Sequence, residues 1–330
     1  MTPGSRSAQL SRRHLLIGLG GALCTAGLAG CGISWGDVRL DTGYSPSPPD
    51  LTVDDLARFS AVDAVSTLLL QAQSLAGSVD SPSADVAADL VAAHQTQLTA
   101  LGPLPGPIPS ASATPSGWPS PAPTSAPPVD LTGLATGEAA AAESMLDGVD
   151  DLSGTVAALI VSVAAGLQGA SQVAAQVAGV DGPELSAVPT LPSRLDAESS
   201  PEAIAAVAAL VAADDAAGFG YAPYAAAMAG EDRARAVSLL SLHNQRSLAV
   251  RTLADAAGFD LPPPPAAYQV PPTTDPPQAC AELEAACARA GADLIGRGDA
   301  DARRLGRAVL LQAGVAQSAW AGIVALPGLS

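Results

Sequence analysis

From residue 53 onward, apolar residues recur at the three- and four-residue spacing of one face of an α-helix, and they rarely alternate as in a β-strand. The apolar stretches are rich in alanine, leucine and valine, and breaks rich in proline and glycine separate them. The sequence therefore predicts an all-α chain. Acidic residues at the starts and glycine or proline at the ends place eight helices, over 53–76, 82–101, 131–150, 151–180, 201–228, 230–258, 276–297 and 299–325.

The predicted helices fall into two halves with the same order of elements. In each half a tight turn joins two helices, a long proline-rich segment follows, and two more helices come after it. This segment is 102–129, with ten prolines, in the first half and 262–277, with eight, in the second. A long connection after the second helix suits a four-helix bundle with one crossover. We expect two such bundles, over 53–180 and 201–330, joined by an interdomain linker at 181–200.

Short matches between the halves favour an internal duplication. The second helices carry LVAAH, ending at His94, and LLSLH, ending at His243. The fourth helices carry a Leu-Gln pair at 167–168 and again at 311–312. Because alanine-rich helices match one another easily, two unrelated bundles remain the alternative.

The residues before the first helix look like an export signal. Arg12 and Arg13 precede a weakly apolar stretch that ends in Leu-Ala-Gly-Cys at Cys31. This resembles a twin-arginine signal peptide, over 1–30, joined to a bacterial lipoprotein box, which implies cleavage before Cys31 and acylation of its thiol. The alternative, an uncleaved span, would need about 20 apolar residues. We expect a lipoprotein on the extracytoplasmic face of the cell membrane, with 31–52 as its tether.

The charge of the chain excludes some partners. Its 15 basic residues face 32 acidic ones, and the net charge is −17. Nucleic acid and an anionic bilayer surface are therefore poor electrostatic partners, and contact with the lipid bilayer would depend on the acylated Cys31. An envelope protein or a small ligand is the expected partner. The chain has one dense group of arginines. We expect them to lie on solvated helix faces and to pair with nearby acids: Arg246, Arg251, Arg303, Arg304 and Arg307.

Four stretches of the second half carry a family resemblance. They are AADDAAGFGYAPY at 212–224, LHNQRSLAVRTLADAAG at 242–258, PPPPAAYQVP at 262–271 and LPGL at 326–329. With them, residues 201–329 resemble a ferritin-like domain of unknown function found in exported actinobacterial proteins. The resemblance implies a ferritin-like C-terminal bundle with a long crossover. Where the family usually has a Glu-His pair, this chain has Asp214 and Asp215.

The metal ligands of a ferritin-like centre are absent from this sequence. Such centres use a glutamate from each of two helices and a Glu-x-x-His from each of the other two. Val91 and Leu240 stand three residues before His94 and His243, and neither predicted fourth helix contains a histidine. We therefore expect no catalytic residues and no cofactor, with iron or manganese as the alternative.

A weaker set of metal candidates remains. His94 and His243 lie on apolar helix faces, and the first helix of each bundle offers an interior acid: Asp63 in the first, Asp214 or Asp215 in the second. The simplest interpretation is a core histidine hydrogen-bonded to an acid or to a backbone group. A mononuclear metal site and general acid–base chemistry are the alternatives.

Phe219, Tyr221 and Tyr224 are candidate pocket residues in a chain otherwise poor in aromatics. Either they line a pocket beneath the crossover at 262–277, or they fill the core. No glycine-rich phosphate loop and no serine nucleophile motif occurs. We expect a non-catalytic binding or scaffold lipoprotein. The alternatives are a metal-dependent oxidoreductase using Asp214, Asp215 and His243, and a small-molecule carrier.

Overall fold

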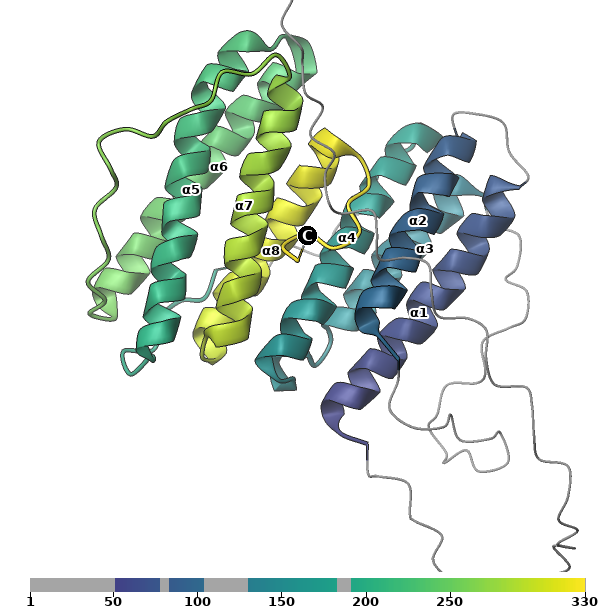
Figure 1. The fold of residues 1–330 in the computed structure, drawn as a ribbon, viewed down its shortest axis with the longest axis horizontal. Coiled ribbons are helices and arrows are strands. Elements are labelled where there is room, and N and C mark those ends of the chain that lie inside the picture. The colour runs from purple at the N-terminus through teal and green to yellow at the C-terminus, as the bar shows by residue number, and fades with distance from the viewer. Residues whose placement is uncertain (1–50, 78–82, 104–129, 183–190, 330) are drawn as a thin grey trace, which may run out of the picture. The chain divides into compact units, whose positions relative to one another are not determined.

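All regular structure in the described part of the chain is helical, which confirms the predicted fold class. The computed structural model describes residues 51–77, 83–103, 130–182 and 191–329. The predicted signal, Cys31 and most of the linker 102–129 lie outside these ranges. Within them are a short 3-10 helix, η2 (Val149–Asp151), and eight α-helices: α1 (Val53–Ala76), α2 (Ser83–Leu101), α3 (Leu131–Leu146), α4 (Gly154–Ala178), α5 (Pro201–Ala227), α6 (Gly230–Ala256), α7 (Pro276–Arg297) and α8 (Ala300–Ala321) (Figure 1).

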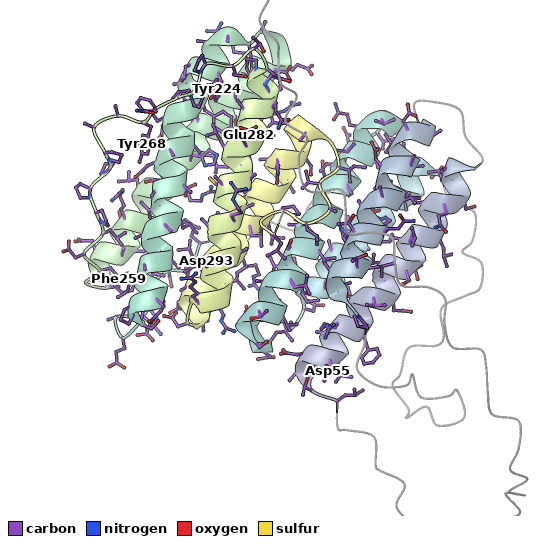
Figure 2. The ribbon with its side chains drawn as sticks, viewed as in Figure 1. Asp55, Tyr224, Phe259, Tyr268, Glu282 and Asp293 are labelled. Carbon is purple, nitrogen blue, oxygen red and sulfur yellow. The ribbon has the colours of Figure 1, made fainter. Side chains whose placement is uncertain are left out.

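Side-chain caps fix where most helices begin. Thr52 and Asp55 form a capping box at the start of α1, in which each side chain binds the backbone N–H of the other; Asp55 is labelled in Figure 2. Asp130, Ser200 and Asp299 accept backbone N–H groups at the starts of α3, α5 and α8. These polar residues precede apolar stretches, so the helix starts could be predicted closely.

Two helices end about four residues before their predicted ends, in each case because the chain turns near a glycine with positive φ. The helix predicted over 131–150 ends at Leu146, since Gly148 has a φ of 71° and η2 follows it. The last helix ends at Ala321 rather than near residue 325, since Gly322 has a φ of 80°. Residues other than glycine rarely adopt such angles.

The helices pack as two four-helix bundles in the same order. In the first bundle α1 contacts α2 and α3, while α4 contacts α2 and α3. In the second, α5 contacts α6 and α7, and α7 contacts α8. The crossover between α6 and α7 runs along the outer side of the second bundle (Figure 1).

Helix α4 joins the bundles because it is buried on nearly all sides. It packs on α3 in its own bundle and on α7 and α8 in the other (Figure 1). Both α4 and α5 are long and apolar enough to cross a membrane, but 78% of the most apolar window of α4 is buried inside the fold. In this structure α4 is a core helix shared by both bundles.

The segment that follows α8 strengthens this contact. Ser162 of α4 donates a hydrogen bond of 2.8 Å to the carbonyl of Pro327, and Gln97 of α2 donates one of 3.0 Å to the carbonyl of Ala325. The absence of a side chain at Gly166 of α4 lets this segment approach, since a Cβ there would overlap the carbonyl oxygen of Ala325. Residues 322–329 therefore tie the second bundle to α2 and α4 of the first.

We predict that Gly166→Ala destabilises the protein by about 1–3 kcal/mol, the usual cost of overpacking a core. Gly296→Ala is the matched control, because a Cβ there meets nothing within 4 Å. Alanine normally stabilises a helix over glycine by roughly 0.5–1 kcal/mol, so the control should be neutral or stabilising. Urea unfolding followed by circular dichroism measures both. Equal stabilities would contradict the close approach at Gly166.

Candidate functional site

The second bundle contains a buried histidine between two carboxylates. His243 of α6 is fully buried. Its Nδ1 lies 3.0 Å from Oδ1 of Asp214 on α5, and its Nε2 lies 2.9 Å from Oε1 of Glu284 on α7. Both carboxylates are buried too. Because α5 packs on both α6 and α7, the three side chains meet in the middle of the bundle.

Arg246 completes this cluster, contrary to the expectation that it lies on a solvated face. It stands one turn after His243 on α6 and is 4% exposed. Its Nε lies 2.9 Å from Oδ2 of Asp214, its Nη2 binds Oδ1 of the same carboxylate, and its Nη1 donates a 2.7 Å hydrogen bond to Gln312 of α8. A buried carboxylate needs a cation or several donors beside it, and Arg246 supplies both.

Two aromatic side chains hold Glu284 in place. Tyr221 of α5 donates a hydrogen bond of 2.6 Å to Oε1 of Glu284, and Trp320 of α8 donates one of 3.1 Å to the hydroxyl of Tyr221. The ring of Tyr221 also stacks on that of His243, with centroids 5.5 Å apart. We call the buried residues Asp214, Tyr221, His243, Arg246 and Glu284 the core network.

The core network is electrostatically balanced. Burial alone would raise the pKa of Asp214, but Arg246 and the hydrogen bond from His243 bring it below its usual value. Burial alone would lower the pKa of His243, but hydrogen bonds to Asp214, Cys287 and Glu284 raise it to about 11. His243 is therefore protonated at neutral pH. The carboxyl groups of Asp214 and Glu284 then lie against the cationic Arg246 and His243.

Cys287 of α7 adds a thiol beside Asp214 and His243. Its Sγ lies 3.7 Å from Oδ1 of Asp214 and 3.9 Å from Nδ1 of His243. Burial raises the pKa of this thiol to about 11. One donor atom from each of the three residues lies within 4.8 Å of the others, and these are atom types that bind transition metals.

The three residues fit a metal ion only if Arg246 is displaced. The Nη2 atom of Arg246 contacts Asp214 Oδ1 and lies 3.1 Å from His243 Nδ1. It therefore occupies the space in which an ion would have to meet both ligands. The neighbouring acid, Asp215, is directed elsewhere, because it accepts hydrogen bonds from Ser247 and, at 2.5 Å, from Arg251. Of the sequence candidates in this bundle, the structure brings together Asp214 and His243 but not Asp215.

A groove lies between α5, α6 and the crossover, with a volume of about 720 Å³. Phe219 is 43% exposed in it, and its ring centroid lies 5.6 Å from that of Tyr268, which is on the crossover (Figure 2). Tyr221 belongs to the core network, and Tyr224 donates a hydrogen bond of 3.2 Å to the carbonyl of Pro271. Of the three candidate pocket aromatics, Phe219 lines the groove. Its other lining residues are Asp215, Gly218, Ala222, Pro223, Leu240, Asn244, Pro264, Pro265 and Val270.

The core network and the groove lie in the part of the chain that comparison with known families recognises. Residues 206–330 match the family described as Domain of unknown function (DUF4439). No curated protein and no solved structure matches the chain. The match confirms a C-terminal domain of unknown function, which the sequence resemblance had placed at 201–329. Both the groove and the whole core network belong to the DUF4439 region.

Outside the DUF4439 region, the first bundle holds a simpler buried pair. His94 of α2 is fully buried, with Nε2 2.9 Å from Oε1 of Glu138 on α3 and Nδ1 3.1 Å from Oε1 of Gln97. The second carboxylate oxygen of Glu138 has no partner among the described residues, and burial raises the pKa of this acid. The expected acid, Asp63, is half-buried, and within the described ranges it makes no hydrogen bond to His94.

The two buried histidines are placed alike. Each lies on the second helix of its bundle and contacts a glutamate of the third, and each contacts the residue one turn later on its own helix. That residue is Gln97 in the first bundle and Arg246 in the second. In the first bundle, where no acid of α1 is bonded to His94 among the described residues, this position holds the neutral Gln97. In the second bundle, where Asp214 of α5 is bonded to His243, it holds the charged Arg246. This correspondence favours the internal duplication.

Sequence reasoning missed the importance of Glu138, Arg246 and Glu284. A signal for Glu284 existed, because Cys280 and Cys287 stand seven residues apart in the helix predicted over 276–297 and therefore share a helix face. Glu284 is four residues after one cysteine and three before the other, which places it on the same face. Both cysteines are buried in the structure. No comparable signal marks Arg246, which the sequence places among other arginines.

We predict that Asp214→Leu destabilises the protein by about 3–5 kcal/mol, because it leaves Arg246 buried without its carboxylate. The double variant Asp214→Leu/Arg246→Met should be more stable than this single variant, since it removes both charges. Urea unfolding compares the three proteins. As a control, Asp293→Ala breaks a surface ion pair with Arg297, on α7 (Figure 2), and should cost less than about 1 kcal/mol. A double variant no more stable than the single one would contradict the pairing.

The two glutamates should respond differently to neutralisation. Glu284→Gln weakens the acceptor of both Tyr221 and His243, and charged hydrogen bonds of this kind contribute about 1.5–3 kcal/mol each. Glu138→Gln should cost less, because one oxygen of Glu138 has no partner among the described residues and burial disfavours its charged form. Parallel urea unfolding of the two variants measures the difference. An equal loss would show that Glu138 is as tightly bound as Glu284.

Proposed function

We propose that the mature chain is a lipid-anchored binding or scaffold protein of the cell envelope that does no chemistry. The core network carries this proposal. Its two acids are matched by Arg246 and protonated His243, and each acid already accepts hydrogen bonds from side chains around it. A general base needs an accessible lone pair, and a metal centre needs a free cation position. The core network offers neither, which favours a structural role for it.

The metal-dependent alternative has less support. It relied on Asp214, Asp215 and His243 facing one space, but Asp215 accepts from Ser247 and Arg251 instead. Arg246 stands between the other two and any incoming ion.

The groove beneath the crossover supports a binding role. Ligand sites in proteins usually measure roughly 300–1,000 Å³ and combine apolar walls with a few polar groups. This groove has that size, an exposed phenyl ring at Phe219 and an amide at Asn244. It is open to solvent along one side, which suits the surface of an envelope partner better than an enclosed small molecule. A small-molecule carrier is the second candidate, favoured by the ring pair of Phe219 and Tyr268.

The proposed location rests on the N-terminal sequence. Arg12 and Arg13 before an apolar stretch, and the lipoprotein box at Cys31, are the features of exported, acylated proteins. The ferritin-like assignment is likewise part of this proposal. Its support is the four-helix arrangement of α5 to α8 with a long connection between α6 and α7.

We predict that Cys31→Ala releases the protein from the membrane as a folded, helical and metal-free chain. Without the thiol no acyl chain can attach, and an acidic protein has no electrostatic affinity for an anionic bilayer. Membrane fractionation locates the protein, and elemental analysis of chelator-free preparations measures its metal content. A His94→Ala/His243→Ala protein serves as the control. Near-stoichiometric metal that this control loses would overturn the non-catalytic proposal, and membrane retention of Cys31→Ala would overturn the anchoring.

A further inference from the structure

The guanidinium of Arg246 contacts two of the three atoms that a metal ion would contact. Its Nη2 meets Oδ1 of Asp214 and lies 3.1 Å from Nδ1 of His243. The thiol of Cys287 lies within 4 Å of these same two ligand atoms. One positive group thus contacts the carboxylate and the imidazole, and the thiol lies beside the same two side chains.

Glu284 also fixes the orientation of the His243 ring, as a carboxylate does for many metal-binding histidines. Oε1 of Glu284 lies 2.9 Å from Nε2 of His243, and Tyr221 and Trp320 in turn hold this glutamate. A carboxylate on the far nitrogen fixes the ring and leaves the near nitrogen for the ion, as it does for most metal-binding histidines. The near nitrogen here is Nδ1, which faces Asp214 and Cys287.

We propose that Asp214, His243 and Cys287 form a ligand set for a zinc-type transition metal ion, in which the guanidinium of Arg246 takes the place of the ion. The inference rests on the proposed function, in which the natural protein carries no metal. Nitrogen, sulfur and oxygen donors together select Zn²⁺ or Co²⁺ over Mg²⁺ or Ca²⁺, which prefer oxygen alone. Three protein ligands leave the fourth tetrahedral position to water.

The guanidinium of Arg246 has to leave this position before an ion can reach both Asp214 and His243. With Arg246 in place, the ion would bring two further charges against a guanidinium that has no route to water, since its side chain is 3% exposed.

The test is a Co²⁺ titration of the mature chain carrying Cys31→Ala, with and without Arg246→Ala. We expect one bound Co²⁺ per chain in Arg246→Ala, with a thiolate-to-cobalt absorption band and tetrahedral visible bands. The protein that retains Arg246 should show neither. Adding Cys287→Ser should abolish the thiolate band. Arg251→Ala is the matched control. Arg251 lies on α6, like Arg246, but it pairs with Asp215, and in the described part of the chain it bonds to none of the three ligand residues.

A second variant keeps the test decisive if Arg246→Ala folds poorly. Arg246→Gln copies the residue that stands one turn after the histidine in the first bundle, Gln97, and it should bind Co²⁺ in the same way. If both variants are unfolded without metal, Co²⁺ should restore their helicity.

Each remaining result overturns a specific part of the inference. Folded Arg246 variants that bind no Co²⁺, or unfolded ones that Co²⁺ does not restore, would show that the three residues are not a ligand set. Tight Co²⁺ binding by the protein that retains Arg246 would show that the guanidinium does not replace the ion. That result would also remove the support for a metal-free function, whereas the first result would leave the proposed function standing.

Discussion

A carboxylate that no water reaches can stay ionised only if the protein supplies an opposite charge or several hydrogen-bond donors, and the second bundle is organised around this requirement at Asp214. The cost of burying an unpaired ion is several kcal/mol, comparable with the whole stability of a domain. Arg246 meets the requirement from α6, while His243 connects the same carboxylate to Glu284 on α7. The register of α5, α6 and α7 is therefore fixed by charge as well as by apolar packing.

The same constraint limits what the bundle can do chemically. The acids of the core network accept hydrogen bonds from its own cations and from Tyr221, to whose hydroxyl Trp320 donates in turn. In the proposed binding role, the surface of the bundle and not its core would meet a partner. The groove under the crossover is lined by prolines on one side, and Asn244 packs closely against α5 on the other, where a Cβ at Gly218 would overlap its side chain.

Periodicity and caps predicted the helices well, because both are local properties of the sequence. Boundaries were missed where a glycine turned the chain early, at Gly148 and Gly322, since a helix-compatible sequence continues past both. The site was harder to predict. A helix face can be recognised from the sequence, so His94 and His243 were correctly placed in the interior.

Which side chains pair between two different helices is not a local property of the sequence. Asp63 was as plausible a partner for His94 as Glu138, and only the packing of α2 on its neighbours separates them. Arg246 was assigned to solvent because arginines usually lie there, and its burial depends on Asp214 lying 32 residues earlier in the chain.

The comparison of the bundles shows why such a pair cannot be predicted from either residue alone. A buried charge without its partner is strongly destabilising, so the acid on the first helix and the arginine on the second must appear or disappear together. Among the described residues, the first bundle has no acid of α1 bonded to His94 and no arginine on α2, whereas the second has both Asp214 and Arg246, which is the pattern expected if two copies of one bundle diverged through a coupled exchange of two residues.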